Sequence, residues 1–316
     1  MSHIPQTKVV ALGGGHGLFA SLSALRRLSL DITAIVTVAD NGGSSGRLRD
    51  EMGILPPGDL RMALAALCGD DKWGRQWADV LQHRFESSGE LQGHAVGNLL
   101  IAALWQILDD HVAGLDLVGE LLDAQGRVLP MSKVPLDIEA DARIDGEIRQ
   151  VRGQVEVATT AGRIEAIRLI PKDPPAATEA VSAILEADFV VLGPGSWFTS
   201  VLPNLLVPEI RSALAGTAAR KIVVLNLAPQ AGETEGFNVA DHLNSLAEHA
   251  DGLSFDIVLS DTHQDQNLVD LGAKKLGAQA RTFDIASRMF ADRHDPLLLA
   301  AAFRSVMDQA EITNQS

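Results

Sequence analysis

The sequence predicts an α/β fold: a Rossmann-like, doubly wound, mostly parallel sheet with a small antiparallel β insertion. Short apolar runs such as Val9–Leu12 and Phe189–Leu192 stop abruptly at glycine- and hydroxyl-rich loops, which is typical of parallel strands covered on both faces. Helical patterns follow several of these loops, whereas residues from about 128 to 170 alternate between polar and apolar. We therefore assign residues 1–316 to a single α/β domain that carries this insertion.

The composition narrows the class of protein. Hydrophobic residues make up 46% and charged residues 21% of the chain, and the net charge is −15. This charge argues against a nucleic-acid-binding protein, because such domains are usually basic. The single cysteine, Cys68, lies in an apolar run and excludes an intrachain disulfide, so we expect a buried structural thiol. We see no signal peptide and no membrane span, and we expect a cytoplasmic protein.

The first glycine loop predicts a site for an anion. Lys8–Leu12 reads as a strand, and a helical stripe of leucines follows the glycines. Backbone N–H groups at such a strand–loop–helix junction bind phosphates. The candidate ligand residues of this loop are Gly14, Gly15, His16 and Gly17. One register, Gly15-x-Gly17-x-x-Ala20, also matches a dinucleotide fingerprint, with Asp40 placed to accept from a ribose hydroxyl.

A second loop, from Asp40 to Arg47, strengthens the prediction of a phosphate site. Its six residues from Gly42 to Arg47 include three glycines and two serines, which suits a nest of backbone amides closed by an arginine. It is not a Walker loop, because no Lys-Ser/Thr follows the last glycine. The alternative is an ordinary surface loop with solvated arginines. The candidates here are Asp40, Asn41, Gly43, Ser44, Ser45 and Arg47.

Two helix starts add further polar candidates. Pro56–Asp59 begins a helix with Asp59 as its expected N-cap, and Arg61 follows in the first turn. A cation is poorly placed there for the helix dipole and so indicates a nearby anion, the alternative being a solvated arginine. His94 and Asn98 are four residues apart at the start of an apolar helix that we expect in the interior. The two side chains either face a ligand or form a hydrogen-bonded pair of polar groups within the core.

The rest of the chain returns to the α/β pattern after the insertion. Alternation over residues 143–148, 154–157 and 163–167 predicts three antiparallel strands. Later apolar runs, Phe189–Leu192, Ile222–Leu225 and Ile257–Leu259, each end in a polar loop. With the two earlier predicted strands, Lys8–Leu12 and Ile32–Val38, this makes five strands whose loops lie along the carboxyl ends of the sheet. Open α/β sheets bind ligands there.

The loops together resemble those of a known family. Gly-Gly-Gly-x-Gly, Asp40-x-Gly-Gly-Ser-Ser-Gly-Arg, Pro-Pro-Gly-Asp59, Gly-His94-x-x-Gly-Asn98 and Gly193-Pro-Gly195-Ser196-x-x-Thr199-Ser200 follow one another in this order. The chain resembles the bacterial YvcK proteins, the gluconeogenesis factors, which are relatives of the CofD phospholactate transferases. The resemblance runs from about Lys8 to Ala302.

This resemblance implies a CofD-like fold and a regulatory protein that binds a UDP-sugar, notably UDP-N-acetylglucosamine. It also implies a part in cell shape and peptidoglycan supply during gluconeogenic growth, with a second copy of the chain and cell-wall regulatory proteins as candidate partners. Mapped by motif, the ligand residues extend to Gly193, Gly195, Ser196, Thr199, Ser200, Gln230 and Arg293. YvcK-like proteins have no established catalytic activity, whereas their CofD relatives transfer a phospholactyl group from a nucleotide-activated donor with magnesium.

Departures from the family pattern favour binding over chemistry. His16 stands where Thr is usual, and Asn41 replaces an Asp, which removes a carboxylate from any Mg²⁺ site. The first hypothesis is therefore a UDP-sugar-binding regulator with no resident cofactor or metal. The second is a CofD-like transferase with Asp40 or Asp59 as base and Mg²⁺ as its ion. The third, an NAD-linked oxidoreductase, rests only on the glycine fingerprint.

Overall fold

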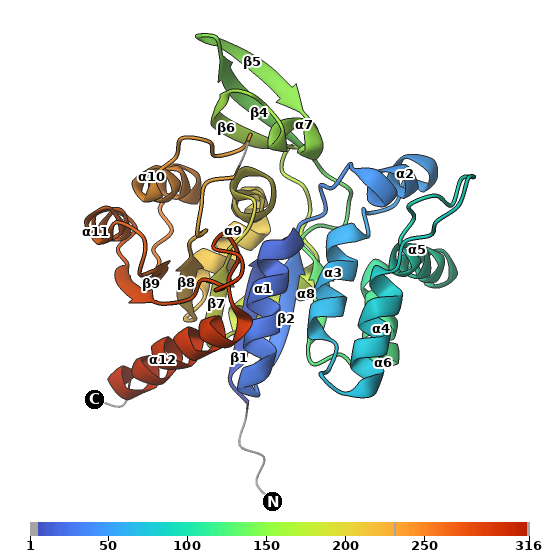
Figure 1. Ribbon diagram of the computed structural model, residues 1–316, viewed down its shortest axis with the longest axis horizontal. Coiled ribbons are helices and arrows are strands. Elements are labelled where there is room, and N and C mark those ends of the chain that lie inside the picture. Colours follow the sequence, from blue (N-terminus) through green and yellow to red (C-terminus); the bar gives the residue numbers. More distant parts are fainter. Residues whose placement is uncertain (1–5, 231, 315–316) are drawn as a thin grey trace, which may run out of the picture.

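Seven parallel strands form the central sheet of the protein. The computed structural model describes residues 6–230 and 232–314. The strand order is β10-β9-β8-β7-β1-β2-β3 (Figure 1). The strands are β1 (Lys8–Gly13), β2 (Asp31–Val36), β3 (Arg127–Pro130), β7 (Phe189–Leu192), β8 (Arg220–Val224), β9 (Ile257–Asp261) and β10 (Gln279–Phe283). The predicted α/β class is confirmed, and β3 and β10 are two strands that the sequence did not predict.

Helices cover both faces of this sheet. In Figure 1, α1 (Gly15–Leu25), α3 (Gly58–Leu67) and α12 (Pro296–Asn314) lie in front of it, and α1 contacts both of the others. On the opposite face, α8 (Thr178–Glu186) packs against α9 (Pro208–Gly216). Two further groups flank the ends of the sheet. Beyond β3 lie α4 (Lys72–Gln82), α5 (Val96–Leu108) and α6 (His111–Leu122), and near β9 and β10 lie α10 (Val239–Ala250) and α11 (Gln266–Lys275).

The β insertion lies over the carboxyl ends of the parallel strands, at the top of Figure 1. Its sheet has the order β5-β4-β6, all antiparallel, with β4 (Asp137–Ile144), β5 (Glu147–Arg152) and β6 (Arg163–Ile170). The structure differs from the predicted range of 128–170 at its start, because Arg127–Pro130 pairs with β2 in the main sheet.

The predicted strand over residues 154–157 is wrong, because these residues form the short helix α7 (Gln154–Ala158). Gly153, with φ of +110°, ends β5 and turns the chain. The Val155 N–H donates to the Asn41 side chain, which satisfies one of the free donors at the helix start. Val157 then enters the core with no exposed surface. Tertiary contacts therefore override a local alternating pattern.

Three other predictions concern the interior. Cys68 is buried, as expected, and burial raises the pKa of its thiol to about 11, which suits a structural role. The expectation that α5 is wholly interior is wrong at its carboxyl end, where Ile107 is 73% exposed. In the part of the chain that the structure describes, no helix has both the length and the apolar character needed to cross a bilayer.

Candidate functional site

The sheet has its topological switch point between β1 and β7. These two strands are neighbours, but the chain proceeds from β1 to β2 on one side and from β7 to β8 on the other. The loops that follow them therefore diverge, and a crevice forms at the carboxyl ends of the strands. Both loops belong to the predicted set, Gly13–Gly17 and Gly193–Ser200.

The two loops touch through glycine backbone. A Cβ atom on Gly17 would lie 2.2 Å from the Pro194 carbonyl oxygen and 2.3 Å from the Gly195 Cα. No side chain larger than a hydrogen fits at this contact. Gly14 is the N-cap of α1 and Gly15 has a φ of +55°, so the first turn of α1 presents backbone N–H groups at the crevice. Such a helix start is a ready site for an anion.

A cavity of about 490 Å³ opens beside this helix start. It brings together His16 of α1, the loop after β8 and the segment that contains Arg293. His16 and Arg293 are both exposed, and the Arg293 guanidinium lies 4.9 Å from the centre of the Phe290 ring. The predicted residues that line this cavity are His16, Gly17, Gly195, Gln230 and Arg293.

Asn226 holds the wall of the cavity that the β7 loop forms. Its side chain accepts from the Gly195 N–H and donates to the Gly195 carbonyl, both at 2.8 Å. Gln230 donates to the Ser196 hydroxyl at 3.3 Å and accepts from the Trp197 N–H. The sequence prediction included Gln230 but missed Asn226, although Asn226 directly follows a predicted strand. Gly193, with φ of +78°, starts this loop.

Thr199 and Ser200 lie deeper than the cavity surface. Thr199 is 1% exposed and contacts the Glu233 carboxylate, whose pKa burial raises to about 7. The Ser200 carbonyl accepts from Thr37, and its hydroxyl would lie 3.2 Å from a Cβ atom on Gly14. The structure therefore brings Ser200 to the first glycine loop, whereas Thr199 faces Glu233.

Two carboxylates lie together on the β2 side of the same helix start. Asp59 accepts from the Gly15 N–H, and burial together with the neighbouring Asp40 raises its pKa to about 7. Burial also raises the pKa of Asp40, although the Gly42 N–H, which donates to it at 2.8 Å, opposes this shift. The N-cap prediction for Asp59 is wrong, because Pro57 is the N-cap of α3 and Asp59 points across to α1 instead.

Arg61 is buried next to these carboxylates. It is 4% exposed, so it is not the solvated arginine of the alternative prediction. Its Nε and Nη1 atoms have no hydrogen-bond partner in the described part of the chain. Burial lowers the pKa of Arg61 to about 10, and Arg84 acts in the same direction, while Asp59 and Asp40 oppose the shift. A buried guanidinium with free donors is suited to an anionic group.

Ser44, His94 and Asn98 form a buried cluster behind the second loop. The Ser44 hydroxyl lies 3.0 Å from His94 Nδ1 and accepts from Asn98 Nδ2 at 3.0 Å. The pKa of His94 is lowered by burial and by Arg47. His94 and Asn98 thus meet through a shared serine, which favours the core-pair alternative for their local role. Ser45 instead accepts from the Gly58 N–H at 2.7 Å, close to Asp40.

Asn41 and Arg47 engage other segments of the chain. Asn41 donates to Glu156 at 2.8 Å and accepts from Val155, and both partners are in α7 of the insertion. Arg47 donates to the carbonyls of Glu90 and Gln92. Gly43, with φ of +49°, begins α2 (Gly43–Met52). Ligand contacts from Asn41, Gly43 and Arg47 stay predictions.

Comparisons with known proteins agree on one family. The model of the family described as 2-phospho-L-lactate transferase CofD matches residues 9–293. A Mycobacterium leprae protein that provisionally carries the name gluconeogenesis factor is 51% identical, with 97% of this chain and 87% of the relative covered. A Mycobacterium tuberculosis relative of the same name is 52% identical, with 94% of this chain and 90% of the relative covered.

A solved structure and a further sequence relative agree with this family. A crystal structure of a UPF0052-family protein from Bacillus halodurans is similar with a TM-score of 0.85 at 36% identity, and covers 95% of this chain and 99% of the other. A gluconeogenesis factor from Halalkalibacterium halodurans is 43% identical over 76% of this chain and 73% of its own.

Proposed function

This chain belongs to the CofD family, among its gluconeogenesis-factor relatives, and from that premise we propose that it binds a UDP-sugar and acts as a regulator rather than an enzyme. UDP-N-acetylglucosamine is the ligand that we propose first. In this proposal ligand binding reports nucleotide-sugar supply during gluconeogenic growth and links it to cell shape and peptidoglycan synthesis. Cell-wall regulatory proteins or a second copy of the chain would receive that signal.

The observation that carries the proposal is the 490 Å³ cavity at the switch point, between the first turn of α1 and Arg293. Its volume lies in the range of small-molecule sites. The α1 N-terminus offers N–H groups to a diphosphate, and Arg293 adds a charged donor to the lining of the same cavity. The Asn226 and Gln230 amides, which also bond the β7 loop, give the cavity a polar wall that suits the hydroxyl groups of a sugar.

A CofD-like transferase is the second candidate, and the Asp40–Asp59 pair is the observation that favours it. A carboxylate with a pKa of about 7 can hold or release a proton at neutral pH, as a general base must. The described residues contain no group of three His, Cys, Asp or Glu that could hold a metal ion. Mg²⁺ would therefore need ligand phosphate oxygens besides Asp40 and Asp59, and it would supply charge neutralisation there.

Isothermal titration of the purified protein tests both candidates. UDP-N-acetylglucosamine, UDP-glucose, UDP alone and NADH are titrated with and without Mg²⁺. The ligand is then recovered, and mass spectrometry determines whether it is intact. Magnesium-independent binding of a UDP-sugar that is recovered intact supports the regulator. Magnesium-dependent consumption of an activated donor supports the transferase, and binding of NADH alone contradicts both.

A further inference from the structure

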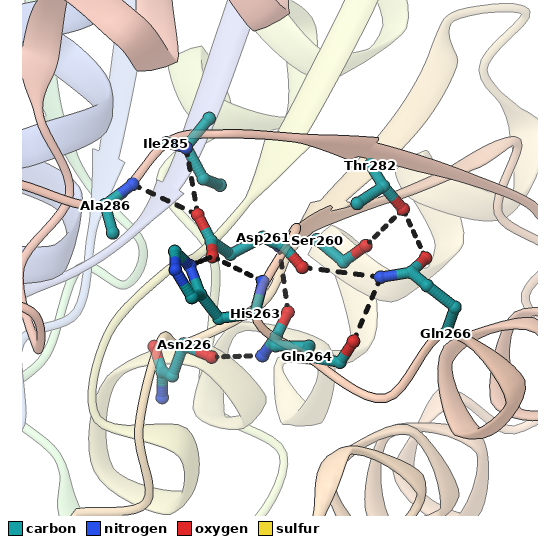
Figure 2. A network of polar contacts seen from close by, with 9 residues as sticks. All are labelled: Asn226, Ser260, Asp261, His263, Gln264, Gln266, Thr282, Ile285 and Ala286. Carbon is teal, nitrogen blue, oxygen red and sulfur yellow. Dashed lines mark hydrogen bonds and ion pairs between the residues drawn. The ribbon is translucent and has the colours of Figure 1, made fainter.

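Asp261, at the end of β9, has a buried carboxylate whose two oxygen atoms both accept hydrogen bonds. It is 2% exposed. One carboxylate oxygen accepts from the backbone N–H groups of Ile285 and Ala286, at 2.9 and 3.1 Å. The other accepts from the His263 N–H at 2.9 Å and lies 2.6 Å from the His263 ring Nδ1 (Figure 2). A buried carboxylate with this many donors is a fixed anchor rather than a mobile group.

Asp261 anchors the base of a closed segment, residues 285–295. Inside the segment, Ala286 pairs with His294, and the Ser287 N–H donates to the Arg293 carbonyl at 2.7 Å. The Asp295 N–H returns to the Ile285 carbonyl at 2.9 Å, next to the Asp261 contact. Asp292, Arg293 and His294, near the carboxyl end of this segment, line the 490 Å³ cavity. Arg293 thus belongs to a loop whose attachment to the sheet includes the Asp261 carboxylate.

Asp261 is also linked, through Gln264 and Asn226, to the loop after β7 that lines the cavity. Its backbone N–H donates to the Gln264 side chain at 3.0 Å, and Gln264 donates to the Asn226 carbonyl at 2.8 Å (Figure 2). Asn226 in turn holds Gly195 through both atoms of its amide. An unbroken chain of hydrogen bonds therefore runs from the Arg293 segment, through Asp261, to the glycine loop that touches α1.

We propose that Asp261 is a positioning residue of the ligand site: its carboxylate holds the 285–295 segment so that Arg293 faces the first turn of α1. This inference rests on the proposed function only for the identity of the ligand. The Asp261 side chain does not line the cavity and so acts through Arg293 rather than by contact with the ligand. The isosteric amide cannot replace it, because one end of an amide donates and would oppose an N–H donor in either orientation.

The test compares Asp261→Asn with Asp256→Asn in the full chain. Asp256 is the control: it is an exposed aspartate at the amino end of the same strand, and its carboxylate accepts from the Lys221 N–H at 2.8 Å. Hydrogen exchange is measured for the 285–295 segment, and UDP-N-acetylglucosamine affinity is measured by titration. We expect faster exchange in 285–295 and an affinity loss of about tenfold for Asp261→Asn only.

A double-mutant cycle separates positioning from general destabilisation. In an Arg293→Ala background, Asp261→Asn should reduce affinity by less than about twofold, because the group it positions is already gone. A loss in that background as large as in the wild type overturns the inference, as does unchanged exchange in 285–295. If the wild type binds no UDP-sugar, the proposed function fails, and the exchange measurement still decides whether Asp261 holds the segment.

Discussion

Two carboxylates, Asp40 and Asp59, and the buried Arg61 lie close together in the candidate site. Asp59 and Asp40 repel each other, and Arg61 beside them keeps two N–H-bearing nitrogen atoms without a partner in the described chain. Such an arrangement costs free energy in the folded protein, because buried charge is favourable only when it is paired and hydrogen-bonded. Residues that destabilise the fold are expected where they serve a site.

The pH dependence of stability tests this arrangement through Asp59→Asn. The pKa of Asp59 is raised from 3.8 to about 7, so the folded state binds a proton that the unfolded state has already lost. Wild-type stability from this group is therefore lost as pH rises from about 4 to 7. The variant, which has no such proton, should gain stability relative to the wild type over that window, by roughly 1–4 kcal/mol at pH 8.

Urea unfolding of both proteins from pH 4 to 8 measures the difference. Asp141→Asn is the control, because Arg168 lowers the pKa of Asp141 below its ordinary value of 3.8. Its contribution is lost only as pH falls below about 4, so its difference from the wild type should stay nearly constant from about pH 4 to 8. A stability difference for Asp59→Asn that does not change with pH would contradict a raised pKa at Asp59.

Arg293 offers the sharpest test of ligand contact by a single side chain. Arg293→Ala should weaken UDP-N-acetylglucosamine binding by about 1.5–3 kcal/mol if its guanidinium bonds a charged phosphate. Titration measures the loss. Arg211→Ala serves as the control, because Arg211 forms an exposed ion pair with Asp251 outside the cavity lining. Equal affinity of the wild type and Arg293→Ala, with folding intact, would remove Arg293 from the site.

At the scale of elements, the contact between α1 and the β7 loop fixes the shape of the site. Gly17 lies inside the first turn of α1, and its missing side chain lets that turn approach Pro194 and Gly195. The α1 N-terminus and the β7 loop therefore meet in close contact through backbone rather than through side chains.

Gly17→Ala should separate these two elements. Its Cβ would lie 2.2 Å from the Pro194 carbonyl oxygen, so one backbone must move, and we expect a loss of about 1–3 kcal/mol in the free energy of unfolding. Gly119→Ala in α6 is the control, because nothing lies within 4 Å of its Cβ position and helix propensity should stabilise it by about 0.5–1 kcal/mol. Denaturant unfolding measures both, and equal stability of Gly17→Ala and wild type would contradict the close contact.

The sequence predicted those elements whose cause is local. Apolar runs that end in polar or glycine-rich loops identified five strands of the sheet and the loops at its switch point. The polar edge strand β10, Gln279–Phe283, has no such run. Helix α7 has an alternating pattern, and its first turn is bonded by Asn41, which is more than one hundred residues away in the sequence. Likewise the family resemblance indicated Arg293, but only the fold shows that Asp261 bonds the backbone at the start of its segment.

At the scale of the whole molecule, one apolar core joins both halves of the sheet and the insertion. Ile35 of β2, Val258 of β9 and Ile138 of β4 belong to the same cluster of buried side chains. Arg49 of α2 also forms an ion pair with Asp137 of the insertion, so the loop from Asp40 to Arg47 is tied to it from both ends. Parts that share one core are expected to unfold together.

Thermal unfolding of the full chain tests this unity and the ligand at once. Tryptophan fluorescence includes signals from Trp105 in α5 and Trp197 in the loop after β7, which lie on opposite sides of the switch point. Far-ultraviolet circular dichroism reports on all helices and strands. We expect one transition with the same midpoint by both measurements. UDP-N-acetylglucosamine at about one hundred times its Kd should stabilise the folded chain by about 2.7 kcal/mol and raise that midpoint as a whole. Arg293→Ala at the same ligand concentration should show a smaller rise. Two transitions, or a ligand that moves only one of them, would mean that the insertion or one half of the sheet folds independently of the site.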